Sequence, residues 1–149
     1  MSPLGRPEGE DRSAQHEATP MTYQLTQRFF FEAAHTLRRE HEADASRRIH
    51  GHTYRAKVTV GGVPDARSGM VVDLALLRLA IEQVRSQLDH RLLDDVEGLG
   101  PATLENLCRF IHDHVGCPDW RVVSVEVGRE ASGDSCCLRA EGRSLISDR

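Results

Sequence analysis

The chain has 149 residues, of which 39% are hydrophobic and 28% charged, and its formal net charge at pH 7 is −4. This length suits one globular domain, and the hydrophobic runs are far shorter than the roughly 20 residues that span a bilayer. Acidic and basic residues are interspersed, which excludes the basic patch typical of proteins that bind nucleic acid or anionic lipid.

The domain boundaries follow from composition. Residues 1–20 are rich in Pro, Gly, Glu and Ser and contain few hydrophobic side chains, so they are predicted to form a disordered leader. One domain is expected over residues 21–142, followed by a polar tail over residues 143–149. The N-terminus lacks the layout of a secretion signal, and the 4 cysteines show no paired spacing. We therefore expect a cytoplasmic protein with reduced thiols.

The first predicted elements are two strands and two helices. Residues 22–35 mix β-branched and aromatic side chains, and residues 52–60 alternate Tyr54, Ala56, Val58 and Val60 on one face. An amphipathic helix is predicted over residues 73–90, with Asp73 as its N-cap. A second helix is predicted over residues 103–115, where Thr103 can cap the first turn.

Two further strands are predicted over residues 121–130 and 135–141. The order strand, strand, helix, helix, strand, strand favours an α+β fold, in which a four-stranded antiparallel sheet carries two helices on one face. Phe30 and Tyr54 are expected to leave the other face of the sheet partly apolar. A sheet face of this kind usually packs against a partner subunit, so we expect a homo-oligomer.

Three histidines have the spacing of a metal site. In a strand, His50 and His52 point to the same side, and antiparallel pairing of the first two strands can bring His35 beside them. Three imidazoles without a thiolate are typical of a catalytic zinc site, whose open position takes water or a substrate oxygen. The alternative is that His50 and His52 are half-exposed strand residues that bond to their neighbours.

Two other positions each allow two interpretations. Asp89 and His90 end the first predicted helix, where a cationic histidine can complement the helix dipole. Alternatively, they form an acid–base pair in which the carboxylate orients the imidazole. Glu130 is either a solvated carboxylate at the end of a strand or a buried acceptor for two parallel N–H groups of an amidine-like edge.

The motifs "FFFEAAH", "HGHTY", "GMVVDL", "LDHRLL" and "TLENL", followed by Glu130, occur in this order. Over residues 22–141 the series resembles the 6-pyruvoyl tetrahydropterin synthase and 6-carboxytetrahydropterin synthase family. The resemblance implies zinc ligands at His35, His50 and His52, and a proton relay at Asp89 and His90. It also implies that the amino-pyrimidine edge of a pterin is bound by Glu130, with the ring near Thr103 and Glu105.

The resemblance further implies a fold, an assembly and a substrate. The family has the tunnelling fold, ββααββ, and its trimers stack into hexamers around a β-barrel, with active sites between subunits. Its zinc-dependent lyase chemistry acts on 7,8-dihydroneopterin triphosphate, and its 6-carboxy members belong to queuosine and 7-deazapurine biosynthesis. By this resemblance the partners are a small pterin and further copies of the chain, with neither nucleic acid nor membrane.

Ser46 departs from the family pattern, because the family's catalytic base is usually a cysteine at this position. A serine hydroxyl is too weakly acidic to replace a thiol whose pKa is about 8.5 before tuning. Three outcomes follow. Glu42 or Asp44 can supply the base, as a glutamate does in a branch that forms 6-hydroxymethyl-dihydropterin; the chain can catalyse a different pterin reaction; or it can be a non-catalytic zinc- or pterin-binding oligomer.

Overall fold

The computed structural model describes residues 21–41 and 43–141. Most of the domain predicted over residues 21–142 is therefore described, whereas the predicted leader, the predicted tail and Glu42 lie outside the described residues. In chain order, the elements are β1 (Tyr23–His35), α1 (Ala43–Arg47), β2 (His50–Gly62), α2 (Leu74–Leu88), β3 (Arg91–Leu92), the 3-10 helix η1 (Leu93–Asp95), α3 (Leu104–Val115), β4 (Arg121–Arg129) and β5 (Asp134–Arg139).

The sheet has five strands in the order β3-β1-β2-β4-β5. The four predicted strands pair antiparallel, but the prediction of a purely antiparallel four-stranded sheet was wrong, because β3 pairs parallel to β1. His90 adopts a φ of 55° directly after α2, and its N–H donates to the Glu32 carbonyl at 2.6 Å. This turn lays the two residues of β3 along the edge of β1. A strand of two residues is too short to produce a periodic pattern in the sequence.

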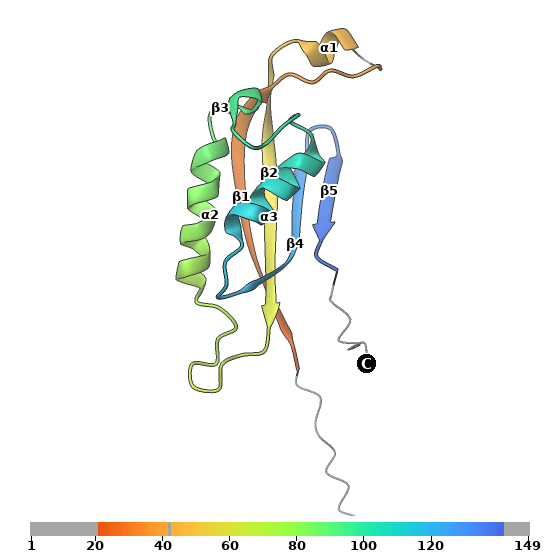
Figure 1. The fold of residues 1–149 in the computed structure, drawn as a ribbon. Helices are drawn as coiled ribbons and strands as arrows, with labels where there is room; N and C mark the ends of the chain where they lie inside the picture. The colour runs from red at the N-terminus through yellow and green to blue at the C-terminus, as the bar shows by residue number, and fades with distance from the viewer. Residues whose placement is uncertain (1–20, 42, 142–149) are drawn as a thin grey trace, which may run out of the picture.

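The two predicted helices, α2 and α3, begin at the predicted caps. The Asp73 carboxylate accepts from the Ala75 N–H, and the Thr103 hydroxyl accepts from the Asn106 N–H. Helices α2 and α3 pack on one face of the sheet, as Figure 1 shows. Their buried residues join those of β1, β2 and β4 in one core. Among the described residues, no helix is long and apolar enough to cross a membrane.

The opposite face of the sheet is more polar than predicted. Tyr54 is only 1% exposed and stacks on Phe31 with ring centroids 5.0 Å apart, so it belongs to the core on the helix side. Its assignment to the uncovered face was wrong, because the register pairs Tyr54 with Phe31 and strand residues two apart share a face. Phe30 is 51% exposed on the uncovered face, as predicted. In the single chain this sheet is open rather than closed into a barrel.

Candidate metal centre

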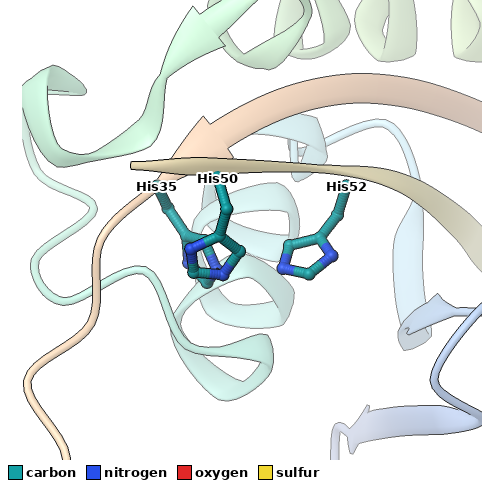
Figure 2. Close-up of side chains that lie close together, drawn as sticks. All are labelled: His35, His50 and His52. Carbon is teal, nitrogen blue, oxygen red and sulfur yellow. The ribbon is translucent and has the colours of Figure 1, made fainter. Parts of the chain in front are cut away.

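The three predicted metal ligands come together in the structure. His35 ends β1 and pairs across the sheet with His50 at the start of β2, and His52 follows on the same face. One ligand atom from each ring lies within 4.8 Å of the others, and the ring centroids are 4.6 to 5.0 Å apart. Figure 2 shows the three rings gathered at the adjacent ends of the two strands. We call these residues the histidine triad.

Hydrogen bonds to the backbone orient two rings of the triad. His35 Nδ1 donates to the Ala102 carbonyl at 3.1 Å, and His50 Nδ1 donates to the Arg48 carbonyl at 2.7 Å. With Nδ1 protonated, Nε2 of each neutral ring carries a lone pair. These two Nε2 atoms face each other at 3.0 Å. A cation between them replaces the repulsion of two lone pairs with two favourable interactions, and a ligand histidine ordinarily donates its other N–H in this manner.

Two imidazoles of the triad, those of His35 and His52, are held in the form that binds metal. Burial lowers the pKa of His35, which is 2% exposed. Burial and then the charge of Arg129 lower the pKa of His52 to about 4. Both imidazoles are therefore neutral near pH 7, as metal coordination requires. Zn–N bonds of about 2.0–2.1 Å in a tetrahedral site separate ligand nitrogens by about 3.3 Å. The nitrogens of the triad, up to 4.8 Å apart, fit this set after small rotations.

Asp89 is fixed in place while its neighbour His90 is free in solvent. The Asp89 carboxylate accepts from the Glu32 N–H and from Arg85 Nη2, each at 2.9 Å. His90 Nε2 lies 3.7 Å from the carboxylate, and its side chain is 77% exposed. This separation exceeds a hydrogen bond, so the predicted pair is adjacent without being bonded in the single chain.

His90 is not part of the histidine triad. His90 lines a groove together with Glu32 and Thr53, which pair across β1 and β2, and His52 of the triad also borders this groove. Strand side chains alternate between faces, so Glu32 and Thr53 point away from the face that carries His52. His90 therefore lies beside the face of β1 and β2 that carries Glu32 and Thr53, opposite the face that carries the rings of the triad.

The predicted pterin-binding residues are also spread over the chain. Glu130 is 72% exposed and forms an ion pair with Arg55 Nε at 2.7 Å, so its carboxylate is not buried in the single chain. It follows β4 on the uncovered face. Thr103 and Glu105 start α3, close in sequence to Ala102, whose carbonyl accepts from His35. The Thr103 hydroxyl is occupied as the helix cap.

Ser46 and Asp44, two of the residues considered in connection with the missing thiol, lie on α1, a five-residue helix that sequence patterns did not predict. Ser46 is buried, and its carbonyl accepts from the Leu37 N–H at 2.7 Å. Asp44 is exposed in the first turn. Glu42 lies outside the described residues.

Arg129 is a functional candidate that the sequence analysis missed. Its Nη1 donates to His52 Nε2 at 3.4 Å, and its side chain is only 20% exposed. At the end of a strand, an arginine normally indicates a solvated surface. The alternation of Val125 and Val127, both buried, places Arg129 next on the helix side of the sheet, and this signal could have found it.

Comparisons with known proteins agree with this fold. The family model for 6-pyruvoyl tetrahydropterin synthase matches residues 24–141. A 6-pyruvoyl tetrahydrobiopterin synthase of Drosophila melanogaster is 39% identical over 105 residues, which cover 61% of this chain and 62% of that protein. The chain thus spans less than two thirds of that relative. A 6-carboxy-5,6,7,8-tetrahydropterin synthase of Synechocystis is 34% identical over 105 residues, covering 65% of this chain and 80% of the relative.

One relative and one solved structure extend the comparison. A dihydroneopterin monophosphate aldolase of Pyrococcus furiosus is 30% identical over 95 residues, covering 64% of this chain and 76% of the relative. The structure of Caenorhabditis elegans 6-pyruvoyl tetrahydropterin synthase superposes with a TM-score of 0.68 at 25% identity, covering 81% of this chain and 97% of that one. The chain belongs to the 6-pyruvoyl tetrahydropterin synthase family.

Proposed function

We propose that the chain is a zinc-dependent lyase of the 6-pyruvoyl and 6-carboxytetrahydropterin synthase type that acts on 7,8-dihydroneopterin triphosphate or a related pterin. The observation that carries the proposal is the histidine triad, in which two Nε2 lone pairs face each other at 3.0 Å on rings anchored by the backbone. A structural role alone does not explain two buried or half-buried acceptors aimed at one point.

His35, His50 and His52 would hold the zinc ion, because their number and spacing suit a site with three protein ligands. When bound, zinc would polarise the oxygens of the pterin side chain and acidify the neighbouring C–H. The exposed carboxylate of Glu130, with Arg55 beside it, would bind the amino-pyrimidine edge of the pterin. Thr103 and Glu105 would lie near the ring.

Asp89 and His90 would move the proton. The Asp89 carboxylate is held by Glu32 and Arg85, whereas the exposed His90 ring is free to turn toward a substrate. Because His90 lies beside the sheet face opposite the rings of the triad, a complete site would combine the triad of one subunit with the relay pair of another. We propose a homo-oligomer, a hexamer built as a dimer of trimers, which would also cover the open edges of the sheet.

A second candidate reaction is cleavage of the pterin side chain to 6-hydroxymethyl-dihydropterin. Two observations favour it: Ser46 stands where a thiol base is expected, and the chain is similar to the Pyrococcus aldolase. The base in this reaction would be Asp44, which is exposed on α1, or Glu42. The third candidate is a zinc- or pterin-binding oligomer without catalysis.

Product analysis separates these candidates. The zinc-loaded chain would be incubated with 7,8-dihydroneopterin triphosphate, and the pterins identified by chromatography and mass. A 6-pyruvoyl or 6-carboxy product supports the proposed function, and a 6-hydroxymethyl product supports the second candidate. Absence of turnover with one zinc per chain contradicts both and leaves the binding oligomer.

We expect the Ser46→Cys substitution to raise formation of the 6-pyruvoyl or 6-carboxy product by at least about tenfold, because a thiol ionises far more readily than a hydroxyl. Initial rates at saturating substrate would measure the change. Ser46→Ala is the matched control, since it tests whether the hydroxyl contributes at all. An unchanged rate in the cysteine variant would show that the missing thiol does not limit this reaction.

A further inference from the structure

Arg129 brings a positive charge to the histidine triad. It ends β4 with its side chain on the helix side of the sheet, and Nη1 donates to His52 Nε2 at 3.4 Å. Nη2 forms an ion pair with Asp134 at 2.9 Å, and the Ser132 hydroxyl donates to the same carboxylate oxygen. The guanidinium is therefore held from the β4–β5 turn, with one end against the triad.

Two polar groups beside the triad lack hydrogen-bond partners. Within the part of the chain that the structure describes, Arg129 Nε and the Tyr54 hydroxyl are the buried side-chain polar atoms without a partner. The Tyr54 ring lies 5.7 Å from the His52 ring and 6.4 Å from the His35 ring, measured between centroids. Burying a donor without a partner costs about 1–3 kcal/mol. Such a cost is commonly retained where a ligand completes the bonding.

The charge of Arg129 acts on His52, His35 and Tyr54. After burial, its charge is the next cause that lowers the pKa of His52, and it also lowers the pKa of His35. Burial raises the pKa of Tyr54 to about 12, which the charge of Arg129 opposes. The Tyr54 hydroxyl can donate a hydrogen bond, and the guanidinium of Arg129 is a permanent cation.

A metal ion and this guanidinium repel each other across a short, partly buried distance. The guanidinium donates to His52 Nε2, so a metal ion that takes this nitrogen frees an N–H donor of Arg129. An anionic oxygen next to both cations would remove the repulsion and accept the freed donor. The same group would also satisfy the buried donors of Arg129 and Tyr54.

We propose that Arg129 and Tyr54 form a carboxylate-binding site beside the metal centre, in which a metal ion and a carboxylate bind cooperatively. The proposal rests on the metal centre of the proposed function and deepens it, because it assigns the recognition of an anionic group on the substrate or product to two residues of this chain. A neutral group of the same shape gains no such stabilisation.

The test measures the affinity of the full chain for Co²⁺ by competition with a chromophoric chelator, with and without acetate at constant ionic strength. The weak complex of acetate with free Co²⁺ is subtracted. Acetate is expected to tighten Co²⁺ binding to the natural chain by about tenfold, within the usual range of coupling between two ligands. Acetamide, which is neutral and of similar shape, is expected to have no effect.

In Arg129→Gln the effect of acetate is expected to disappear, while Co²⁺ alone binds at least as tightly as to the natural chain because a repelling charge is gone. If Arg129 were only structural, its loss would weaken Co²⁺ binding. Tyr54→Phe removes one oxygen atom and is expected to reduce the acetate effect by several-fold, which provides a second variant that should fold. Arg121→Gln, at the exposed start of the same strand, is the matched control and should retain the full effect.

The outcomes separate the two proposals. Equal effects of acetate in the natural chain and Arg129→Gln, or none in the natural chain although it binds Co²⁺, would overturn the carboxylate site and leave the metal centre standing. A natural chain that binds no Co²⁺ would overturn both.

Discussion

Replacing His50 with alanine is expected to lower the affinity of the chain for Zn²⁺ by more than about 100-fold, and to reduce metal content after dialysis from one ion per chain to almost none. Residues that only support a metal ligand change affinity by about 10- to 100-fold, so loss of a ligand should have a larger effect. His50 is half-buried at the start of β2. Its removal should therefore leave the core intact, whereas His35 is fully buried.

Elemental analysis and competition titration would measure this loss. His112→Ala is the matched control, because His112 lies on α3 outside the triad, where its ring bonds to the neighbouring Asp113. This control should keep one zinc ion per chain. Circular dichroism would establish that both variants fold. A His50→Ala chain that still holds one zinc ion with the natural affinity would contradict the triad as the metal centre, and with it the proposed chemistry.

The histidine triad was predictable because two local rules place it. Residues two apart in a strand share a face, which puts His50 beside His52, and antiparallel pairing of consecutive strands puts His35 opposite His50. The helix starts were predictable for a similar reason, since Asp73 and Thr103 act on N–H groups of their own first turns. Such rules need only neighbouring residues or one strand pairing.

Features that depend on distant parts of the chain were not predictable. β3 exists because His90 turns the chain back to the edge of β1. The bond between Asp89 and Glu32 at this edge joins residues 57 positions apart in the sequence. Arg129 meets His52 across a sequence separation of 77 residues. Alternation alone identifies the face of Arg129, but the register between β2 and β4 decides what it touches there.

The same limit applies to the catalytic assignment. Motif order joins the triad with Asp89 and His90, yet the rings of the triad lie on the helix side of β1 and β2, whereas His90 lines a groove with Glu32 and Thr53 of the other face, which His52 also borders. If one site needs both groups, we expect it to use two chains. A site shared between two chains can be tested without knowing the size of the oligomer.

Mixed oligomers of two inactive variants are expected to recover activity. His52→Ala removes a metal ligand and His90→Ala removes the relay histidine, and each alone should lower turnover by at least about 100-fold, the lower range for general acid–base catalysis. If each site takes the triad from one subunit and the relay from another, random assembly gives about one quarter of the sites both intact halves. In these sites, the intact triad comes from a His90→Ala subunit and the intact His90 comes from a His52→Ala subunit.

Co-expression with two affinity tags and purification on both would select the mixed oligomers, and the rate of pterin product formation would be compared with the natural oligomer purified in the same way. The matched control mixes His52→Ala with His50→Ala. Both changes then damage the metal half, so no site regains a whole triad and activity should stay lost. Recovery confined to the first mixture requires that triad and relay come from different chains. Mixed oligomers as inactive as their parents would instead place both halves within one chain, which the opposite faces of the sheet argue against.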